Sequence, residues 1–558
     1  MADHTKFDDA GQDAKLAAIR EKEEEDLAQV LSGRYGLSYT DLGVVPIDVD
    51  ALRLIPEERA RAAEVVAFAK IAHQVSVALR NPKNPTLEAE LAELETRGFV
   101  LTKFLVSPKS LKKAYSRYAD LSLATVSTAG TFDISGEELE KLSAELTTLG
   151  ALKDRLSATI AEKKGAQVSK IFEEILAAAF VMKASDIHIE PEEDTARIRL
   201  RLDGMLTDIF AFDHHVYRSL NSRIKLLSGL KLNVTDRAQD GRFTVVVNGM
   251  EIEIRCSVIP GNYGESVVLR ILDPRAIQRT LSDIGINPKL LARLQKEIRR
   301  PTGMLLNTGP TGSGKTTSLY TFMRDIHSPE IKIVTIEDPV EYHIQGIVQT
   351  QVGPDYTFAA GLRSVLRQDP DVIMVGEIRD AEVAETAIQA ALTGHFVFST
   401  LHTNNAAGTF PRLVDLEVDP KLFASAVTVS MAQRLVRTLD DTTKKSRPAT
   451  AEEKRMMETV LSTLTDKTLI PPSMDTVWVA VPGEDGSTGY KGRMGIHEAI
   501  FMDDELGEFL RDNPSESDIA KHVLRQGFPT LTQDGIIKVL QGKTSIEELA
   551  RVVDLPLG

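Results

Sequence analysis

Short apolar segments of both strand and helix type fill residues 29–121. Val75–Leu79 and Lys103–Val106 are rich in β-branched, aliphatic or aromatic residues, which predicts two strands. Between them, Leu87–Leu94 places leucines at helical spacing. The segment therefore predicts a small α+β module, and it carries no catalytic constellation.

The pattern changes to regular alternation of polar and apolar positions between residues 166 and 283. In Arg197–Leu202, three arginines fill one strand face and three aliphatic residues fill the other, and Glu251–Val258 alternates in the same way. Asp203–Gly204 is a strong signal for a hairpin turn. A helical pattern from Val168 to Met182 precedes these strands. The segment predicts an α+β domain whose antiparallel sheet carries arginines on one side.

Strand–helix alternation takes over at about residue 284 and predicts a parallel α/β sheet. Ile331–Ile336, Val372–Val375 and Phe396–Thr400 are almost continuously apolar, as strands buried on both faces are. We therefore assign residues 284–558 to one α/β domain.

Four further segments are more polar or less regular. Residues 1–28 are highly charged and predict a solvated helix or a loose tail. Residues 122–150 are rich in Ser, Thr, Gly and Glu and predict that residues 122–165 form a linker with one amphipathic helix, Gly136–Leu149. Within the last domain, residues 438–475 predict a polar insertion of loop and helix, whereas Gly495–Val553 predicts mostly helix.

The composition narrows the class of protein. The 558 residues are 42% apolar and 26% charged, which indicates a globular chain of several domains. The net charge of −15 argues against a protein whose main role is to bind nucleic-acid phosphates. Cys256 is the single cysteine, which excludes an intrachain disulfide and a multi-cysteine metal site. No apolar run approaches the roughly 18–20 residues of a membrane span, and Met1–His4 does not begin a signal peptide, so we expect a soluble, cytoplasmic protein without a transmembrane segment.

A phosphate-binding motif follows the apolar run Met304–Leu306 and precedes a helical pattern. It matches G-x-x-x-x-G-K-[ST] in a strand–loop–helix context. Its glycines let backbone N–H groups turn inward as an anion nest, and the helix directs its positive end to the same place. We expect Lys315 to reach the β- and γ-phosphates and the Thr316 hydroxyl to bind Mg²⁺. The predicted nucleotide-binding residues are Gly309, Pro310, Thr311, Gly312, Ser313, Gly314, Lys315, Thr316 and Thr317.

Chemically active residues follow three of the predicted parallel strands. Glu337 ends one strand, Glu377 comes shortly after the next, and His402 lies past the third, where it is placed to sense the γ-phosphate. The carboxyl ends of parallel strands meet at one edge of a sheet, so these side chains point to one place. We favour Glu337 for orienting the attacking water and Glu377 for holding Mg²⁺. The sequence leaves the reverse assignment open, and also a role for Glu337 in capping a turn.

Together these motifs resemble those of the secretion and type IV pilus assembly motor ATPases, a family of hexameric type II secretion and pilus extension motors. The resemblance covers residues 166–553 and extends to the N-terminal module. It rests on Gly309–Thr317, Ile336–Tyr342, Leu366–Asp380, Thr393–Thr403, Gln433–Arg437 and Gly489–Arg493, with Ala184–Glu190, Gln239–Arg242 and Gly261–Leu272 upstream.

The resemblance implies a RecA-like P-loop NTPase domain, a preceding PAS-like α+β sheet domain and a small docking module at the N-terminus. It implies a homohexameric ATPase in which ATP and Mg²⁺ bind between the two larger domains, with Arg255 and Arg270 as arginine fingers on the phosphates. Family motors act on an inner-membrane platform protein and its pilus or secretion components. The resemblance therefore places the chain at the cytoplasmic face of the inner membrane, with pilus assembly (extension) and type II secretion both open.

The chain departs from the family in its cysteines, and two other classes of protein share some of its motifs. Many assembly-type motors hold Zn²⁺ with four cysteines, but Asp440–Thr443 stands where the first pair is expected, and we predict no zinc site. A ring ATPase that translocates nucleic acid is the alternative function, and the acidic charge argues against it. A nucleotide-binding regulator without turnover is a third class, against which Lys315, Glu337 and Glu377 stand.

Overall fold

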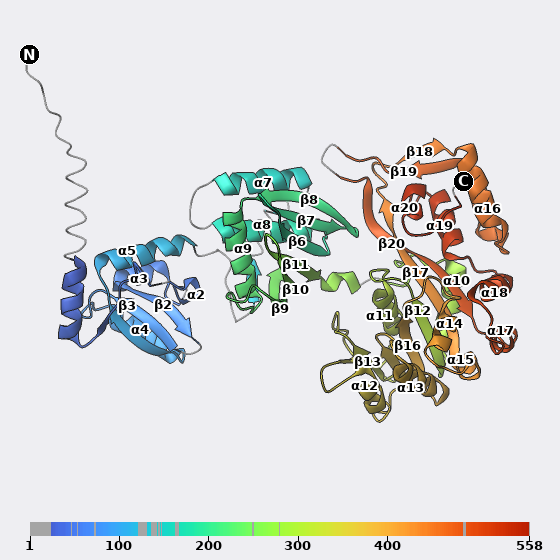
Figure 1. The fold of residues 1–558 in the computed structure, drawn as a ribbon, viewed down its shortest axis with the longest axis horizontal. Coiled ribbons are helices and arrows are strands. Elements are labelled where there is room, and N and C mark those ends of the chain that lie inside the picture. The colour runs from blue at the N-terminus through green and yellow to red at the C-terminus, as the bar shows by residue number, and fades with distance from the viewer. Residues whose placement is uncertain are drawn as a thin grey trace, which may run out of the picture.

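Three parts follow one another along the long axis of the molecule (Figure 1). The computed structural model describes residues 24–556 apart from gaps at 46, 53, 72–73, 121–130, 135–141, 143–144, 147, 162–166, 248–249, 278–279 and 484–486. Of the predicted charged segment 1–28, residues 1–23 lie outside the described residues. Most of the predicted helix Gly136–Leu149 also lies outside them.

The first part is an α+β module, as the sequence predicts. Its sheet has the order β1-β4-β3-β2, in which β3 pairs parallel with β4 and antiparallel with β2. Strand β2 was not predicted, because it follows α3 directly with only Glu64, in a left-handed conformation, between them. The elements are a helix at 24–35, β1 (Ser38–Tyr39), α2 (Val49–Leu52), α3 (Glu57–Ala63), β2 (Val65–Ile71), β3 (Gln74–Leu79), α4 (Leu87–Thr96), β4 (Val100–Leu105), α5 (Pro108–Ser116) and η1 (Arg117–Asp120).

A seven-stranded sheet with the order β5-β9-β10-β11-β6-β7-β8 forms the second part. Its pairs are antiparallel except for β5 beside β9. Asp203 and Gly204 both have positive φ (47° and 88°), which confirms the predicted hairpin turn between β7 and β8. The elements are β5 (Thr131–Ile134), α7 (Leu149–Ala161), α8 (Gln167–Val181), β6 (Asp186–Pro191), β7 (Ala196–Leu202), β8 (Met205–Phe212), α9 (His214–Leu227), β9 (Gln239–Val247), β10 (Met250–Gly261), β11 (Gly264–Leu272) and η2 (Pro274–Ile277).

The predicted linker, residues 122–165, differs from the structure where its residues are described. Strand β5 extends the edge of the middle sheet, and α7 packs against α8 with Leu152 and Leu156 buried in the core of this part. Two leucines at helical spacing in a polar segment were too weak a signal to separate a packed helix from a linker. The middle part therefore begins before residue 166.

A second seven-stranded sheet, ordered β14-β13-β15-β16-β12-β17-β20, forms the third part. Its strands run parallel except for β20, which lies antiparallel to β17 at one edge. All residues of β12, β13, β15 and β16 are buried, which explains their continuous apolar pattern and confirms the predicted parallel α/β sheet. The elements up to β17 are α10 (Pro288–Glu297), β12 (Gly303–Thr308), α11 (Lys315–Ile326), β13 (Ile333–Glu337), β14 (Val348–Gln351), α12 (Phe358–Val365), β15 (Val372–Val375), α13 (Ala381–Leu392), β16 (Phe396–Leu401), α14 (Thr409–Asp415), α15 (Pro420–Ala426) and β17 (Val427–Leu439).

The C-terminal stretch is helical only after Phe501. The prediction of helix from Gly495 onward was wrong at its start, because Gly495 lies inside the long strand β20 (Tyr490–Phe501), which pairs with β17 far back in the sequence. The remaining elements are β18 (Lys445–Pro448), α16 (Ala451–Ser462), η3 (Lys467–Leu469), β19 (Thr476–Val479), α17 (Asp504–Leu510), α18 (Glu516–Val523), η4 (Leu524–Gln526), α19 (Leu531–Leu540) and α20 (Ile546–Ala550).

The insertion at residues 438–475 packs into the core of the third part through Met456, Met457 and Leu461 of α16, and polar contacts order it internally. Arg447 pairs with Glu453 at 2.6 Å, and Glu453 forms a capping box with Thr450 at the start of α16.

Among the described residues, no group of three or more His, Cys, Asp or Glu side chains is placed to hold a metal ion. In the same part of the chain, no helix has the length and apolar character to cross a membrane.

Candidate nucleotide-binding active site

The phosphate-binding loop joins β12 to α11 near the centre of the parallel sheet. Gly314 precedes α11 in the left-handed conformation (φ 88°), which residues with a side chain rarely adopt. At Gly309, a Cβ atom would lie 2.6 Å from the Gln433 carbonyl oxygen, so only glycine fits there. Residues Pro310–Thr317 all border one cleft. The loop and the first turn of α11 therefore face a space suited to a polyphosphate.

A buried polar network lies beneath the loop, and the sequence analysis did not foresee it. Gln433 Oε1 accepts hydrogen bonds from the Ser318 hydroxyl (2.7 Å) and from Asn307 Nδ2 (3.3 Å). These residues lie on β17, α11 and β12 and are buried. The network ties the strand before the loop to the helix after it, and it explains a polar residue at position 307 in an apolar strand.

Lys315 begins α11, and its side chain reaches back into the phosphate loop. Its Nζ donates to the carbonyl oxygens of Gly309 (2.7 Å) and Pro310 (3.2 Å). Burial lowers the pKa of the Lys315 amine to about 8, while the Glu377 carboxylate opposes this shift and Arg434 adds to it. A phosphate oxygen is a stronger acceptor for this amine than either carbonyl, so bound polyphosphate favours the charged form.

Nucleotide affinity is expected to fall as the pH rises above about 8, the pKa of the Lys315 amine in the free protein. Below that pH the amine is already charged, so affinity stays level. Above it, binding requires uptake of a proton, and the dissociation constant for ATP should rise by up to about tenfold per pH unit. Calorimetric titrations in buffers of different ionisation enthalpy measure both the affinity and the proton uptake.

The control is Lys315→Arg, whose guanidinium keeps its charge over this range and should give a level, though weaker, affinity. A level affinity of the unaltered chain from about pH 7 to about pH 9.5 would contradict the argument.

Glu337 ends β13, and three donors fix its carboxylate. Thr335 Oγ1 (2.5 Å) and Gln349 Nε2 (3.2 Å) donate to Oε1, and the buried Tyr320 hydroxyl donates to Oε2. Burial raises the pKa of Tyr320, and the Glu337 charge raises it further, so the phenol remains a donor. Glu337 is only 2% exposed yet borders the cleft. Because Tyr320 lies on α11, the helix that follows the phosphate loop also orients this carboxylate.

Glu377 lies two residues past the end of β15, where its carboxylate pairs with Arg379 and lies 3.4 Å from Nε2 of His402. Strand β15 is between β13 and β16 in the sheet, so their carboxyl ends bring Glu337, Glu377 and His402 to one edge. All three border the same cleft as Lys315. The structure therefore assembles the groups that the sequence predicts to act on the γ-phosphate.

The residues predicted to hold Mg²⁺ fit that ion. The Thr316 hydroxyl and the Glu377 carboxylate border the cleft and offer the hard oxygen donors that Mg²⁺ prefers. This ion keeps several water molecules and takes one or two protein ligands together with substrate phosphates, so two protein ligands suffice.

The cleft has a volume of about 870 Å³ and continues onto the middle part of the chain. Arg201 and Arg270 line it there, and the buried Asp186 pairs with them at 3.1 and 3.0 Å. The register explains this arrangement, since Asp186 on β6 lies opposite Arg201 on β7 and Arg270 on β11. One carboxylate between two guanidinium groups leaves an excess positive charge at the cleft, which suits a phosphate.

Arg255, the other predicted arginine finger, is engaged elsewhere. Arg255 lies on β10, opposite Arg270 on β11. Its guanidinium donates to Glu341 Oε2 (2.9 Å) and to the Val340 carbonyl oxygen (2.6 Å). It is not among the described residues that line the cleft. Of the two predicted fingers, the structure therefore brings only Arg270 to the phosphate loop.

Sequence reasoning missed several residues that border the cleft, among them Asp186, Arg201, Tyr320 and Arg551. Of the three arginines predicted on one strand face, Arg201 is the one beside the Asp203–Gly204 turn. This position at the end of the strand is the feature of the sequence that could have singled it out. Asp186 and Tyr320 act through contacts with distant segments, which a local pattern does not reveal.

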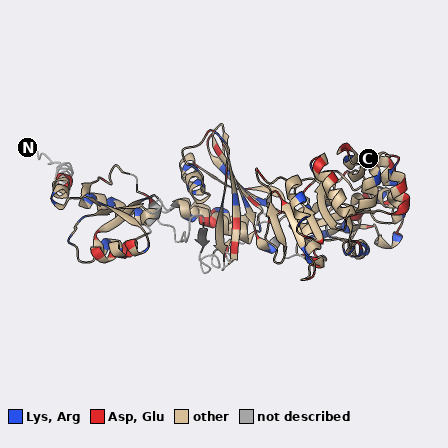
Figure 2. Cartoon of the chain, turned by 90° about the horizontal axis from the view of Figure 1, so that it is seen from below, with Lys and Arg blue, Asp and Glu red and all other residues tan. Residues whose placement is uncertain are grey.

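Charge is distributed over the whole chain. Figure 2 shows Lys and Arg interspersed with Asp and Glu along all three parts. Together with the net charge of −15, this distribution gives no support to the alternative of nucleic-acid translocation.

Comparisons with known proteins show the family that this chain resembles. A family model described as "Type II/IV secretion system protein" matches residues 161–551, and one described as "MshEN domain" matches residues 35–125. The type II secretion system protein E of Pseudomonas aeruginosa is 41% identical over 409 residues, which is 72% of this chain and 80% of that protein. The type II secretion system ATPase E of Vibrio cholerae is 42% identical over 389 residues (69% and 75%). The type IV pilus assembly ATPase PilB of Myxococcus xanthus is 35% identical over 534 residues (94% and 91%).

A solved structure with a similar fold is the ATPase DotB of Yersinia pseudotuberculosis. It aligns with a TM-score of 0.50 and 20% identity, covering 69% of this chain and 93% of that chain. At this identity the likeness concerns the fold alone, and it agrees with the predicted RecA-like P-loop domain.

Proposed function

The chain belongs to the Type II/IV secretion system protein family, and we propose that it is a homohexameric motor for type IV pilus assembly or type II secretion. Its relatives include proteins named as ATPases, and the chain is an ATPase that binds nucleotide. One observation carries the proposal: Lys315, Glu337 and Glu377 on the P-loop domain and Arg270 on the preceding domain border one cleft.

In the proposed reaction, the loop and Lys315 bind the polyphosphate of ATP, and Glu337 accepts a proton from the attacking water. Thr316 and Glu377 would hold Mg²⁺, which when bound would neutralise phosphate charge. Arg270, steadied by Asp186, stabilises the charge that develops on the transferred phosphoryl group.

Because the two halves of the cleft lie on different domains, ATP binding and hydrolysis alter how these domains close on each other. Two contacts between them have to adjust, the Arg255–Glu341 ion pair and the hydrogen bond from the Gly492 N–H to Asp203 (2.9 Å). We propose that an inner-membrane platform protein receives this movement at the cytoplasmic face of the membrane.

The ATPase rate per chain is expected to rise with protein concentration and to level off as the ring assembles. A coupled ATPase assay combined with light scattering on the same samples measures both quantities. Lys315→Ala should assemble in the same way without turnover, which separates assembly from catalysis. A monomer with the full rate would contradict a motor that works as a ring.

The same Lys315→Ala chain, expressed in place of the original, distinguishes the two systems by loss of surface pili or loss of secreted proteins. Addition of DNA should leave the ATPase rate unchanged, and stimulation by DNA would favour the nucleic-acid alternative instead.

A further inference from the structure

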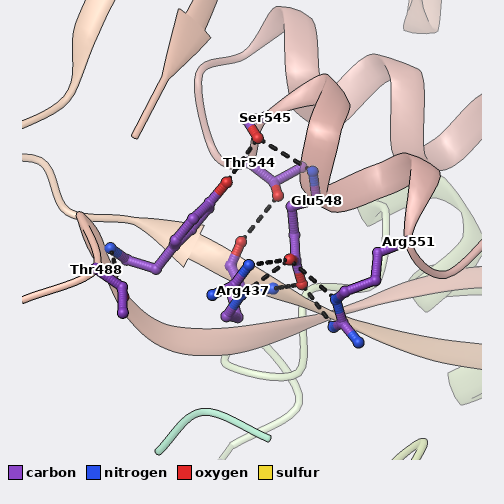
Figure 3. A network of polar contacts seen from close by, with 7 residues as sticks. Arg437, Thr488, Thr544, Ser545, Glu548 and Arg551 are labelled. Atoms are coloured by element: carbon purple, nitrogen blue, oxygen red, sulfur yellow. Dashed lines mark hydrogen bonds and ion pairs between the residues drawn. The ribbon is translucent and has the colours of Figure 1, made fainter. Parts of the chain in front are cut away.

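A buried carboxylate at the C-terminal end of the chain accepts an unusual number of hydrogen bonds. Glu548 on α20 has a fully buried side chain. Its Oε2 accepts from Arg437 Nε (2.8 Å), Arg437 Nη2 (2.6 Å) and Arg551 Nε (3.1 Å). Its Oε1 accepts from the Arg437 backbone N–H (2.9 Å) and Arg551 Nη2 (2.7 Å). Figure 3 shows the carboxylate between the two guanidinium groups.

Several contacts hold the Arg437 side of this network in place. The Tyr490 ring stacks on the Arg437 guanidinium at 4.1 Å, and the Tyr490 hydroxyl bonds to the Ser545 hydroxyl at 2.7 Å. The Thr544 hydroxyl donates to the Arg437 carbonyl oxygen at 2.8 Å. These contacts join β17, β20 and the start of α20, so Glu548 presents a fixed pair of oxygens to Arg551.

Arg551, the second partner of Glu548, is partly exposed at the surface of the cleft. Its side chain is 42% exposed, and both Arg551 and Val552 line the cleft that contains the phosphate loop. Two of its nitrogens are bound to Glu548, which fixes the plane of the guanidinium at the wall of the cleft. The network holds two guanidinium charges and one carboxylate, so a positive excess remains at this wall.

The strand order shows which end of the nucleotide this wall meets. Glu337 ends β13 and Glu377 follows β15, and both strands lie on one side of β12. Strand β17, which carries Leu435 of the cleft wall, lies on the other side. A nucleotide with its γ-phosphate toward Glu337 and Glu377 therefore extends its base and ribose toward Leu435, Val552 and Arg551.

We propose that Arg551 binds the base and ribose end of the nucleotide and that Glu548 is the positioning residue that orients it. A planar guanidinium stacks on a purine and donates to ribose hydroxyls, and Leu435 and Val552 supply apolar contact for the base. The wall thus selects a nucleoside triphosphate over a bare polyphosphate. This assignment rests on the proposed function, because it assumes that ATP occupies this cleft.

The test compares ADP, ATP and inorganic tripolyphosphate, each titrated calorimetrically with Mg²⁺ into the full chain and into Arg551→Ala. We expect ADP and ATP to bind about tenfold more weakly to the variant, the order of one guanidinium–ring contact. Tripolyphosphate should bind both chains within about twofold, because it has no base. Arg525→Ala is the matched control, since Arg525 pairs with Asp503 (2.6 Å) and is not among the described residues that line the cleft.

Glu548→Gln and Arg551→Lys test the positioning role. Both should weaken ADP binding and leave tripolyphosphate binding unchanged, because the first releases the guanidinium and the second removes its plane. Glu548→Gln combined with Arg551→Ala should bind ADP no more weakly than Arg551→Ala alone, which a merely structural role for Glu548 would not produce. If Glu548→Gln does not fold, the comparison of Arg551→Lys with Arg551→Ala still decides the role of Arg551.

Equal weakening of tripolyphosphate and ADP would place Arg551 at the phosphates, and unchanged ADP binding would remove it from the site; either result overturns the proposal. Failure of the unaltered chain to bind any of the three ligands would instead defeat the proposed function.

Discussion

Glu337→Gln is expected to lower ATP turnover about 10³-fold, the usual contribution of a general base, while ATP still binds. The substitution keeps the size of the side chain, and its one remaining oxygen can still accept from Thr335 and Gln349, while the Tyr320 hydroxyl can accept from the new amide, so the buried site stays filled. It removes the charge that accepts the proton from water. Single-turnover hydrolysis and ATP titration on the same preparation separate the chemical step from binding.

Glu377→Gln provides the matched comparison. If Glu377 holds Mg²⁺, its variant should need more Mg²⁺ for half-maximal turnover, whereas Glu337→Gln should not change that requirement. The opposite pattern would exchange the two roles. Full turnover by Glu337→Gln would remove this residue from the chemistry altogether.

Tyr320→Phe tests the support of Glu337 and not the base itself. Loss of the phenol frees one carboxylate oxygen but leaves the other donors in place, so kcat should fall by about tenfold with little change in KM. A change in KM alone would show that Tyr320 only stabilises the helix after the loop.

The part of the site on the P-loop domain was predictable from sequence. Its residues are recognised by where they lie relative to the ends of predicted parallel strands, and all such ends lie at one edge of the sheet. Glu337 ends one strand, Glu377 and His402 lie just past the ends of two others, and Lys315 begins the helix after a fourth. The carboxyl ends of parallel strands meet at one edge whatever the strand order is. The fold class followed from the same pattern of buried strands between helices. The order β13-β15-β16-β12 was not needed to predict that these residues converge.

The other wall of the cleft depends on pairings that the sequence does not specify. Alternation placed several arginines on one face of the middle sheet, but only the register of β6 between β7 and β11 puts Asp186 beside Arg201 and Arg270. Likewise, Arg551 reaches the cleft only because Glu548 packs on β17, more than a hundred residues earlier. Such contacts are set by tertiary packing, which leaves no local pattern.

Arg270→Ala is expected to reduce ATP turnover about 10³-fold, the lower end of the effect of an arginine finger. ADP binding should change little, because the finger acts on charge that develops in the transition state. Arg255→Ala should cost less, since Arg255 is held by Glu341 and Val340 and, of these two arginines, Arg270 is the one that lines the cleft. Single-turnover hydrolysis at saturating ATP, with both variants assembled to the same extent, gives the comparison.

The comparison also reports on movement between the domains. If Arg255→Ala loses more turnover than Arg270→Ala, Arg255 must leave Glu341 and enter the cleft during the cycle, because its side chain pairs with Glu341 outside the cleft lining. Glu341→Gln then separates the cases, since loss of its charge should ease that release and raise turnover. If Arg270 is the finger, Glu341→Gln should leave the chemical step unchanged, and Asp186→Asn should lower it by loosening Arg270.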